Sequence, residues 1–205
     1  MAISFSMIML DNLSKYHIIL ASQSPRRREL LAGLGIPFEV RVLPDVSETY
    51  PVDLPVSQTA EYIAVEKAEA YRGMMAADDL VITADTVVIC GQEVLGKPHD
   101  AADAGRMLRL LSGRTHQVIT GVCIMTKTHA THFSVCTDVT FKALDNDEIS
   151  YYVEKYRPMD KAGAYGIQEW IGYIGVTGLQ GSYFNVMGLP VQRIYEELKC
   201  WDMEG

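Results

Sequence analysis

The sequence contains only four cysteines, and no two of them form a Cys-x-x-Cys pair. In a chain of this size, such widely spaced cysteines indicate buried, free thiols in a reducing compartment. His129 and His132 lie close in sequence, but no third ligand stands near them, which argues against a zinc site. The cysteines are Cys90, Cys123, Cys136 and Cys200.

An excess of basic residues is also absent. Eighteen Lys and Arg residues stand against 26 Asp and Glu residues, which gives a formal net charge of −8. Because a surface of that sign repels long polyanions, we expect no nucleic-acid polymer among the partners. A small phosphorylated ligand is compatible with this charge, since a local cluster of cations can act against the global sign.

Long apolar runs are missing: none approaches the roughly 20 residues that span a bilayer. The apolar stretch 1–10 has no early Lys or Arg and no small-residue cleavage site, so it is a poor signal peptide. We expect a cytoplasmic chain without membrane association, with residues 1–16 as a frayed extension or an alternative start. The GxSxG, P-loop and dinucleotide-binding glycine patterns are absent too.

What is present is an ordinary globular composition, 48% hydrophobic and 21% charged, enough for one large domain or two small lobes around a shared core. Helix-like and strand-like segments interleave, which predicts an α/β fold with a mixed sheet. The expected strands are 18–21, 38–43, 80–90 with a break at 84–86, 93–95, 115–126 and 131–141. The expected helices are 25–34, 57–71 capped by Ser57, 100–111 capped by Asp100, 145–156 and 190–198, with 172–188 irregular.

The segment 24–28, Ser-Pro-Arg-Arg-Arg, directly follows the first strand and predicts a strand that turns straight into a helix. Ser24 is suited to cap that helix, and Pro25 fits its first position. A helix start attracts anions, whereas cations there oppose the helix dipole. Helix stability therefore does not explain Arg26, Arg27 and Arg28, but a phosphate-bearing ligand does.

Asp85 interrupts the apolar run 81–89. A strand buried on both faces has no cheap place for a carboxylate. One interpretation is an Asp at a bulge or strand end, bonded to backbone. The other is a carboxylate at the carboxyl edge of a sheet, where α/β proteins bind ligands, acting as general base or metal ligand.

Three further charged residues have both a functional and an ordinary interpretation. Lys97 lies between a strand and a helix, where it would meet a phosphate or simply be solvated. The stem of Lys67 borders an apolar helix face, which ordinary snorkelling explains as well. Glu48 is a solvated loop charge unless its loop folds over Asp85 and supplies a second oxygen ligand for Mg²⁺ or Mn²⁺.

Gln168 follows a stretch, 160–167, that is rich in small residues and lets a backbone approach a ligand closely. Its amide has one acceptor and two donors, which suits the N3–H and O4 of uracil or thymine. The alternative is a polar side chain that caps nearby backbone.

Seven motifs occur in an order that resembles the Maf family of nucleotide pyrophosphatases, over about residues 17–200. The motifs are ASQSPRR at 21–27, EKA at 66–68, ADT at 84–86, GKP at 96–98, SGRTH at 112–116, DKAGAYGIQ at 160–168 and NVMGLP at 185–190. The chain departs from most relatives at Glu169 and Trp170, where a small residue usually follows the glutamine.

This resemblance implies a mixed, elongated and bent sheet flanked by helices, with two lobes and a central cleft, akin to inosine triphosphate pyrophosphatases. It implies a single domain over residues 17–205, a divalent cation (Mg²⁺ or Mn²⁺) and hydrolysis of a nucleoside triphosphate to monophosphate and pyrophosphate. Arg26, Thr86 and Gln168 match the positions tied to substrate choice, in the form of the branch that acts on dTTP and UTP. A homodimer is expected from the resemblance alone.

The predicted mechanism has a water attack the α-phosphorus, with Asp85 either positioning or deprotonating it. Two rivals stay open: a nucleotide sensor in cell-division control that acts through a partner, and a purine-directed pyrophosphatase. The predicted sites are Asp85 and Lys97 for catalysis, Ser24, Arg26, Arg27, Lys67, Thr86 and Gln168 for substrate, and Glu48 with Asp85 for the metal.

Overall fold

In the part of the chain that the structure describes, a mixed sheet of seven strands forms the centre, and the prediction of a mixed α/β fold is confirmed. The computed structural model describes residues 10–44, 46 and 48–201. The strands follow the order β2-β1-β3-β5-β6-β7, with β4 also paired to β3. Among these seven strands of the described residues, the β1–β2 and β1–β3 pairs are parallel and the other pairs are antiparallel. The strands are β1 His17–Leu20, β2 Glu39–Val40, β3 Asp79–Cys90, β4 Glu93–Leu95, β5 Thr115–Met125, β6 Ala130–Phe141 and β7 Val176–Gln180.

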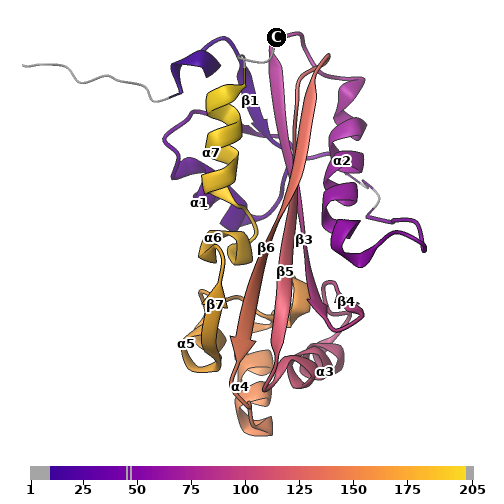
Figure 1. Cartoon of the computed structure of the whole chain (residues 1–205), viewed down its shortest axis with the longest axis vertical. Helices are drawn as coiled ribbons and strands as arrows, with labels where there is room; N and C mark the ends of the chain where they lie inside the picture. The colour runs from indigo at the N-terminus through magenta and orange to yellow at the C-terminus, as the bar shows by residue number, and fades with distance from the viewer. Residues whose placement is uncertain (1–9, 45, 47, 202–205) are drawn as a thin grey trace, which may run out of the picture.

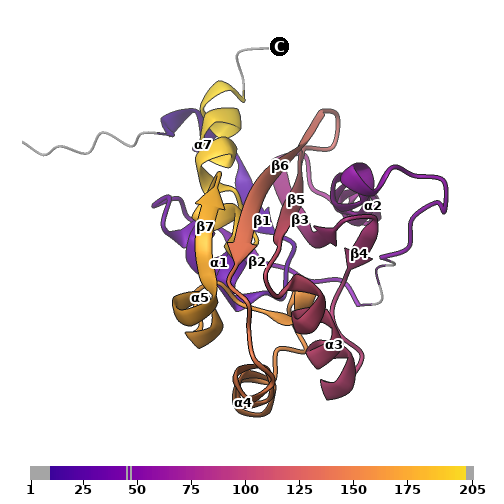
Figure 2. The same cartoon turned by 60° about the horizontal axis from the view of Figure 1, so that its bottom comes forward.

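The helices lie around the long strands β3, β5 and β6, which run along the long axis of the molecule (Figure 1). Helix α2 lies on one side, α1 and α7 on the other, and α3, α4 and α5 gather at the far end (Figures 1 and 2). The α-helices are α1 Pro25–Ala32, α2 Thr59–Arg72, α3 Ala101–Leu111, α4 Asn146–Tyr156, α5 Trp170–Gly175, α6 Tyr183–Met187 and α7 Val191–Cys200. The 3₁₀ turns are η1 Asp11–Leu13, η2 Val56–Gln58 and η3 Ala162–Ala164.

The buried apolar residues form separate clusters toward the two ends of the long sheet. One cluster joins α3, α4 and α5 to the far ends of β3, β5 and β6. Another joins α1 and α7 to β1 and the near end of β3, and a third lies under α2. A core divided in this way suits the predicted pair of lobes, which stays a prediction together with the 17–205 domain boundary. Among the described residues, no helix is long and apolar enough to cross a membrane.

Several local expectations are wrong. The strand expected over 38–43 is reduced to Glu39–Val40, because only these residues pair with β1. Ser57 does not cap α2: it lies inside η2, and the helix begins at Thr59 without a side-chain cap. The stretch 172–188 is not irregular, since it contains β7 and α6, and pairing with β6 outweighs the low strand propensity of glycine.

The expected fraying of residues 1–16 is wrong for its described part, 10–16, and residues 1–9 lie outside the described residues. Leu10 and Leu13 are each 4% exposed and join the cluster that includes α7. Asn12 Nδ2 donates a hydrogen bond to the carbonyl of Leu198 at 2.9 Å. The cysteines are all free, as expected, but the expectation of burial is wrong for Cys136 and Cys200, which are exposed.

Candidate active site

Strand β3 changes its neighbour in the middle, and this change creates the site. Its first part pairs with β1 up to Ile82, and its last part pairs with β4 from Val88. Between them, in the pairings of the described residues, β3 has β5 on one side and no strand on the other. Asp85 lies in this gap, opposite Gly121 of β5. The predicted break at 84–86 and the predicted carboxyl-edge position are therefore wrong: the strand is continuous, and its open edge accommodates the carboxylate.

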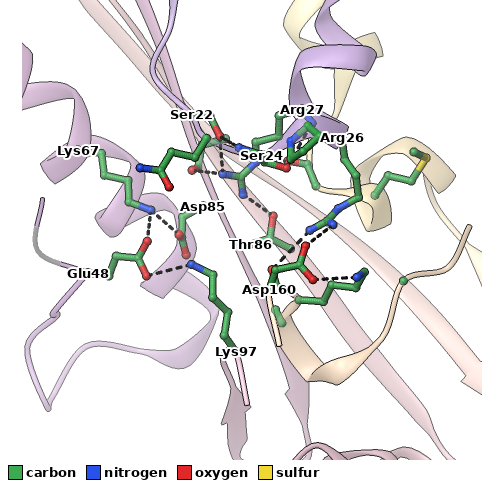
Figure 3. A pocket seen from close by; sticks show the side chains of 18 of the residues that line it. Ser22, Ser24, Arg26, Arg27, Glu48, Lys67, Asp85, Thr86, Lys97 and Asp160 are labelled. Atoms are coloured by element: carbon green, nitrogen blue, oxygen red, sulfur yellow. Dashed lines mark hydrogen bonds and ion pairs between the residues drawn. The ribbon is translucent and has the colours of Figure 1, made fainter. Parts of the chain in front are cut away.

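A cluster of alternating charges surrounds Asp85 (Figure 3). Lys67 Nζ from α2 lies 2.8 Å from Asp85 Oδ1 and 2.7 Å from Glu48 Oε1. Lys97 Nζ approaches the other Glu48 oxygen at 3.6 Å. Burial opposes ionisation of Glu48, but the hydrogen bonds and charges of Lys67 and Lys97 outweigh it and hold its pKa below the usual value. The loop that carries Glu48 thus folds over Asp85, as the second-ligand hypothesis requires.

Helix α2 packs unusually close to the sheet at this point, because β5 has a glycine there. A Cβ atom added to Gly121 would lie 2.3 Å from the carbonyl carbon of Ala60. Thr83, two residues before Asp85 on β3, donates from Oγ1 to the Ala64 carbonyl at 2.6 Å. Because of this close packing, Lys67, one helical turn after Ala64, reaches the carboxylate of Asp85 on β3.

The start of α1 has the predicted form. Ser24 is the N-cap, and its Oγ accepts from the Arg27 backbone N–H at 3.4 Å. The Arg27 side chain turns inward and donates to the carbonyls of Gly188 and Ala84, each at 2.8 Å, and to Thr86 Oγ1 at 3.1 Å. Arg27 therefore satisfies a backbone carbonyl on the open edge of β3. Arg28 is exposed.

Arg26 points toward the loop after α4. Its Nη1 donates to Asp160 Oδ2 at 2.8 Å (Figure 3). The Lys161 ammonium binds the other oxygen, Oδ1, at 2.8 Å. Burial raises the pKa of Asp160, but Lys161 and Arg26 outweigh this and lower it to about 2. Neither Asp160 nor Lys161 was predicted as a site residue, although both open the motif at 160–168.

Gln168 presents an acceptor without a partner. Its Oε1 is buried, and no described atom donates a hydrogen bond to it. Nearby, the buried Tyr165 hydroxyl lies 2.8 Å from His116 Nε2. Burial lowers the pKa of His116 to about 4 against a weaker opposite effect of Asp138, so His116 is neutral at pH 7. An unpaired buried amide oxygen is costly, which is typical of a position that a ligand completes.

One cavity of about 460 Å³ collects these side chains. Every residue predicted for catalysis, substrate or metal lines it, together with Asp160, Lys161 and Tyr165, which were not predicted. Val88, Val118 and Met187 add apolar surface to its wall. The predicted residues are Ser24, Arg26, Arg27, Glu48, Lys67, Asp85, Thr86, Lys97 and Gln168.

The donor chemistry suits a hard divalent cation that arrives with its substrate. No group of three or more His, Cys, Asp or Glu side chains at metal-binding spacing exists among the residues described. Glu48 and Asp85 already converge on a shared cation, the ammonium of Lys67. Mg²⁺ commonly takes one or two carboxylates and completes its shell with phosphate oxygens and water. These two residues therefore fit such an ion.

Similar proteins occur in several bacteria. The dTTP/UTP pyrophosphatase of Phocaeicola vulgatus is 62% identical over 191 residues, covering 93% of this chain and 99% of that protein. The proteins of the same name from Bacteroides thetaiotaomicron and Flavobacterium johnsoniae are 58% and 47% identical, with 93% and 92% of this chain covered. These alignments cover 99% and 96% of those two proteins.

A more distant likeness exists to a solved structure, a nucleoside-triphosphatase (dITP/XTP pyrophosphatase) of Mycobacterium abscessus. It is 14% identical, with a TM-score of 0.43 and 92% of this chain and 97% of that one covered. At that score the likeness carries no weight for the fold or the function. The family model of Maf-like proteins matches residues 17–201. With this match and identities near 60% over nearly the whole chain, the protein belongs to the Maf family.

Proposed function

We propose that this protein hydrolyses dTTP and UTP to the monophosphate and pyrophosphate. The observation that carries the proposal is the convergence of phosphate-binding cations, two acidic groups and an unpaired amide acceptor in one cavity. The names of the relatives, which are 47–62% identical, agree with it. The cavity of about 460 Å³ is within the range of small-ligand sites.

At the phosphate end, Arg26, Lys67 and Lys97 supply positive charge beside the N-terminus of α1. The Arg26 side chain is 23% exposed and that of Lys97 is 58% exposed, and both line the cavity that an incoming triphosphate would enter. Such groups hold the chain of phosphates in line and neutralise charge as the leaving pyrophosphate forms. Arg27 instead donates a hydrogen bond to the Ala84 carbonyl on the open edge of β3.

Asp85 acts on the water. Its side chain is 13% exposed, and Lys67 binds one of its oxygens, which leaves the other carboxylate oxygen toward the cavity. We propose that Asp85 accepts a proton from a water that attacks the α-phosphorus, breaking the bond to the bridging oxygen of pyrophosphate. Glu48 and Asp85 would hold Mg²⁺ or Mn²⁺, which supplies charge neutralisation on the phosphate oxygens.

At the base end, Gln168 Oε1 is free to accept the N3–H of uracil or thymine while the amide nitrogen donates to O4. A site built around such bonds rejects bases that lack them by up to about 10⁴-fold. The predicted homodimer and cytoplasmic location stay predictions.

The test is a substrate panel with Mg²⁺ or Mn²⁺ in which pyrophosphate and orthophosphate are measured separately. We expect dTTP and UTP to yield one pyrophosphate for each nucleotide consumed, and GTP and ITP to react slowly. Asp85→Asn should keep the fold and lose about 10²- to 10⁴-fold in turnover, the contribution of a general base. Glu154→Gln, an exposed carboxylate on α4, is the matched control.

Each rival gives a different outcome in this panel. Fastest turnover of ITP or GTP would refute the base-reading role of Gln168 and favour the purine-directed pyrophosphatase. Binding of dTTP without any pyrophosphate would refute the enzyme and favour the nucleotide sensor. Near-wild-type turnover by Asp85→Asn at saturating metal would remove Asp85 from the mechanism.

A further inference from the structure

Lys161 is a buried cation with two carboxylate partners. The residue is 7% exposed, and its Nζ lies 2.8 Å from Asp160 Oδ1 and 3.0 Å from Glu169 Oε1. A buried ammonium is costly unless paired and hydrogen-bonded, so this position is strongly specified by its partners. Those partners lead to Arg26, at the proposed phosphate end of the site, and to Gln168, the proposed base reader.

The Asp160 branch leads to Arg26. Asp160 binds Lys161 with one carboxylate oxygen and Arg26 Nη1 with the other, at 2.8 Å each. The Asp160 carbonyl also accepts from Arg26 Nη2 at 3.5 Å. The direction of the Arg26 guanidinium is thus set by a carboxylate that Lys161 anchors.

The Glu169 branch leads to Gln168. Glu169 binds Lys161 with Oε1, and its Oε2 accepts a hydrogen bond from the Tyr152 hydroxyl. That hydroxyl in turn accepts a hydrogen bond from the Gly166 backbone N–H at 3.0 Å. The Glu169 backbone N–H closes the turn by donating to the Gly166 carbonyl at 3.0 Å. Gln168 lies within this turn.

The side chains themselves are packed together around Gly166. A Cβ atom placed on Gly166 would be 3.0 Å from Gln168 Nε2 and 3.1 Å from Lys161 Cε. The glutamine amide and the lysine stem therefore border the same small space beside Gly166, together with the Glu169 carboxylate. Displacing Lys161 therefore changes the space that Gln168 occupies.

We propose that Lys161 is a positioning residue that fixes Arg26 and Gln168 relative to each other, so that base selectivity depends on this one buried cation. The inference rests on the proposed function. Glu169 is the acceptor that links the cation to the Gln168 turn. Lys161 acts through its carboxylate partners, and it needs no contact with the nucleotide.

Lys161→Met tests the proposal because it keeps the length of the side chain and removes the charge. We expect kcat/KM for dTTP to fall about tenfold to a hundredfold, mainly through KM, as a displacement near 1 Å would cause. The ratio of kcat/KM between dTTP and GTP should fall about tenfold or more. Lys161→Arg, which restores a cation between the two carboxylates, should recover part of that ratio.

Two further variants keep the test decisive. Glu169→Gln keeps the shape of the acceptor and removes its charge; it should lower the dTTP/GTP ratio while Asp160 still holds Arg26. Combining Lys161→Met with Glu169→Gln leaves fewer unpaired carboxylates, which provides a folded protein if the single variant unfolds. Lys155→Met, an exposed lysine of α4, is the control.

A merely structural lysine would lower kcat equally for every nucleotide, so an unchanged dTTP/GTP ratio in folded Lys161 variants would overturn the inference. That outcome would leave the proposed function intact if the wild type still releases pyrophosphate from dTTP. Absence of pyrophosphate from the wild type would refute the proposed function, and this inference with it.

Discussion

Replacing Gly121 with alanine tests whether close packing between α2 and the sheet is what places Lys67 beside Asp85. The added Cβ would lie 2.3 Å from Ala60 C and Glu61 N and 2.4 Å from Ala60 O. All three are helix backbone atoms, which have no alternative rotamer to adopt. Ordinary contact begins near 3.4 Å, so α2 has to retreat by about 1 Å or the strand has to bend away.

Two effects follow from this retreat. Overpacking of a tight contact costs about 1–3 kcal/mol in the free energy of unfolding. Because Lys67 moves with α2, its bridge between Glu48 and Asp85, now 2.7 and 2.8 Å, lengthens. A misplacement of about 1 Å near reacting groups typically costs about 10²-fold in rate. We therefore expect turnover of dTTP to fall more than the loss of folded protein explains.

The assay combines urea unfolding with steady-state kinetics on the folded variant. Gly73→Ala is the matched control, because Gly73 has an ordinary helical φ of −67° and no atom within 4 Å of the added Cβ. The control should stay within about 0.5 kcal/mol and keep wild-type turnover. Wild-type stability and turnover in Gly121→Ala would refute the idea that this contact sets the site geometry.

Three other predictions concern the buried histidine, the base reader and the metal. Burial lowers the pKa of His116 from 6.5 to about 4, so between these pH values the unfolded state binds more protons than the folded state. The free energy of unfolding should therefore fall by about 3 kcal/mol as the pH drops from 6.5 to 4. Urea titrations at several pH values should show this slope, and His116→Gln should lack that contribution; an identical slope would contradict it. Gln168→Leu should lower kcat/KM for UTP about 10- to 100-fold, the cost of a lost buried hydrogen-bond pair, with little change in kcat; an unchanged KM would remove the base-reading role. Chelation with EDTA should abolish pyrophosphate release, and added Mn²⁺ should restore it; full activity in EDTA would exclude the metal.

The features that could be predicted from the sequence are governed by local chemistry. The caps at Ser24 and Asp100 were predicted from short polar side chains before helical segments, and each accepts a backbone N–H in the structure. The anion-binding character of the α1 start likewise needs only a strand, a cap and a turn of helix. The residues of the site were found mainly through the family motifs, because their convergence depends on contacts far apart in the chain.

The features that could not be predicted depend on which strand ends where. Asp85 was expected at a break, because its neighbours in sequence give no sign that β1 stops pairing at Ile82. Lys161 was passed over because the motif around it indicated only close backbone approach. Its burial follows from Asp160 and Glu169, and neither partner is recognisable without the turn that brings them together.

The open edge of β3 explains how side chains from both faces of one sheet reach a single cavity. Asp85 and Thr86 are consecutive on a strand, so they point to opposite faces, yet both line the site. At an edge without a neighbouring strand, both faces are open to the same space. At this edge the Ala84 carbonyl has no partner from a neighbouring strand, and Arg27 donates a hydrogen bond to it at 2.8 Å. Arg27 therefore takes the hydrogen-bonding place of a missing strand, and the residue before it in sequence, Arg26, lines the cavity.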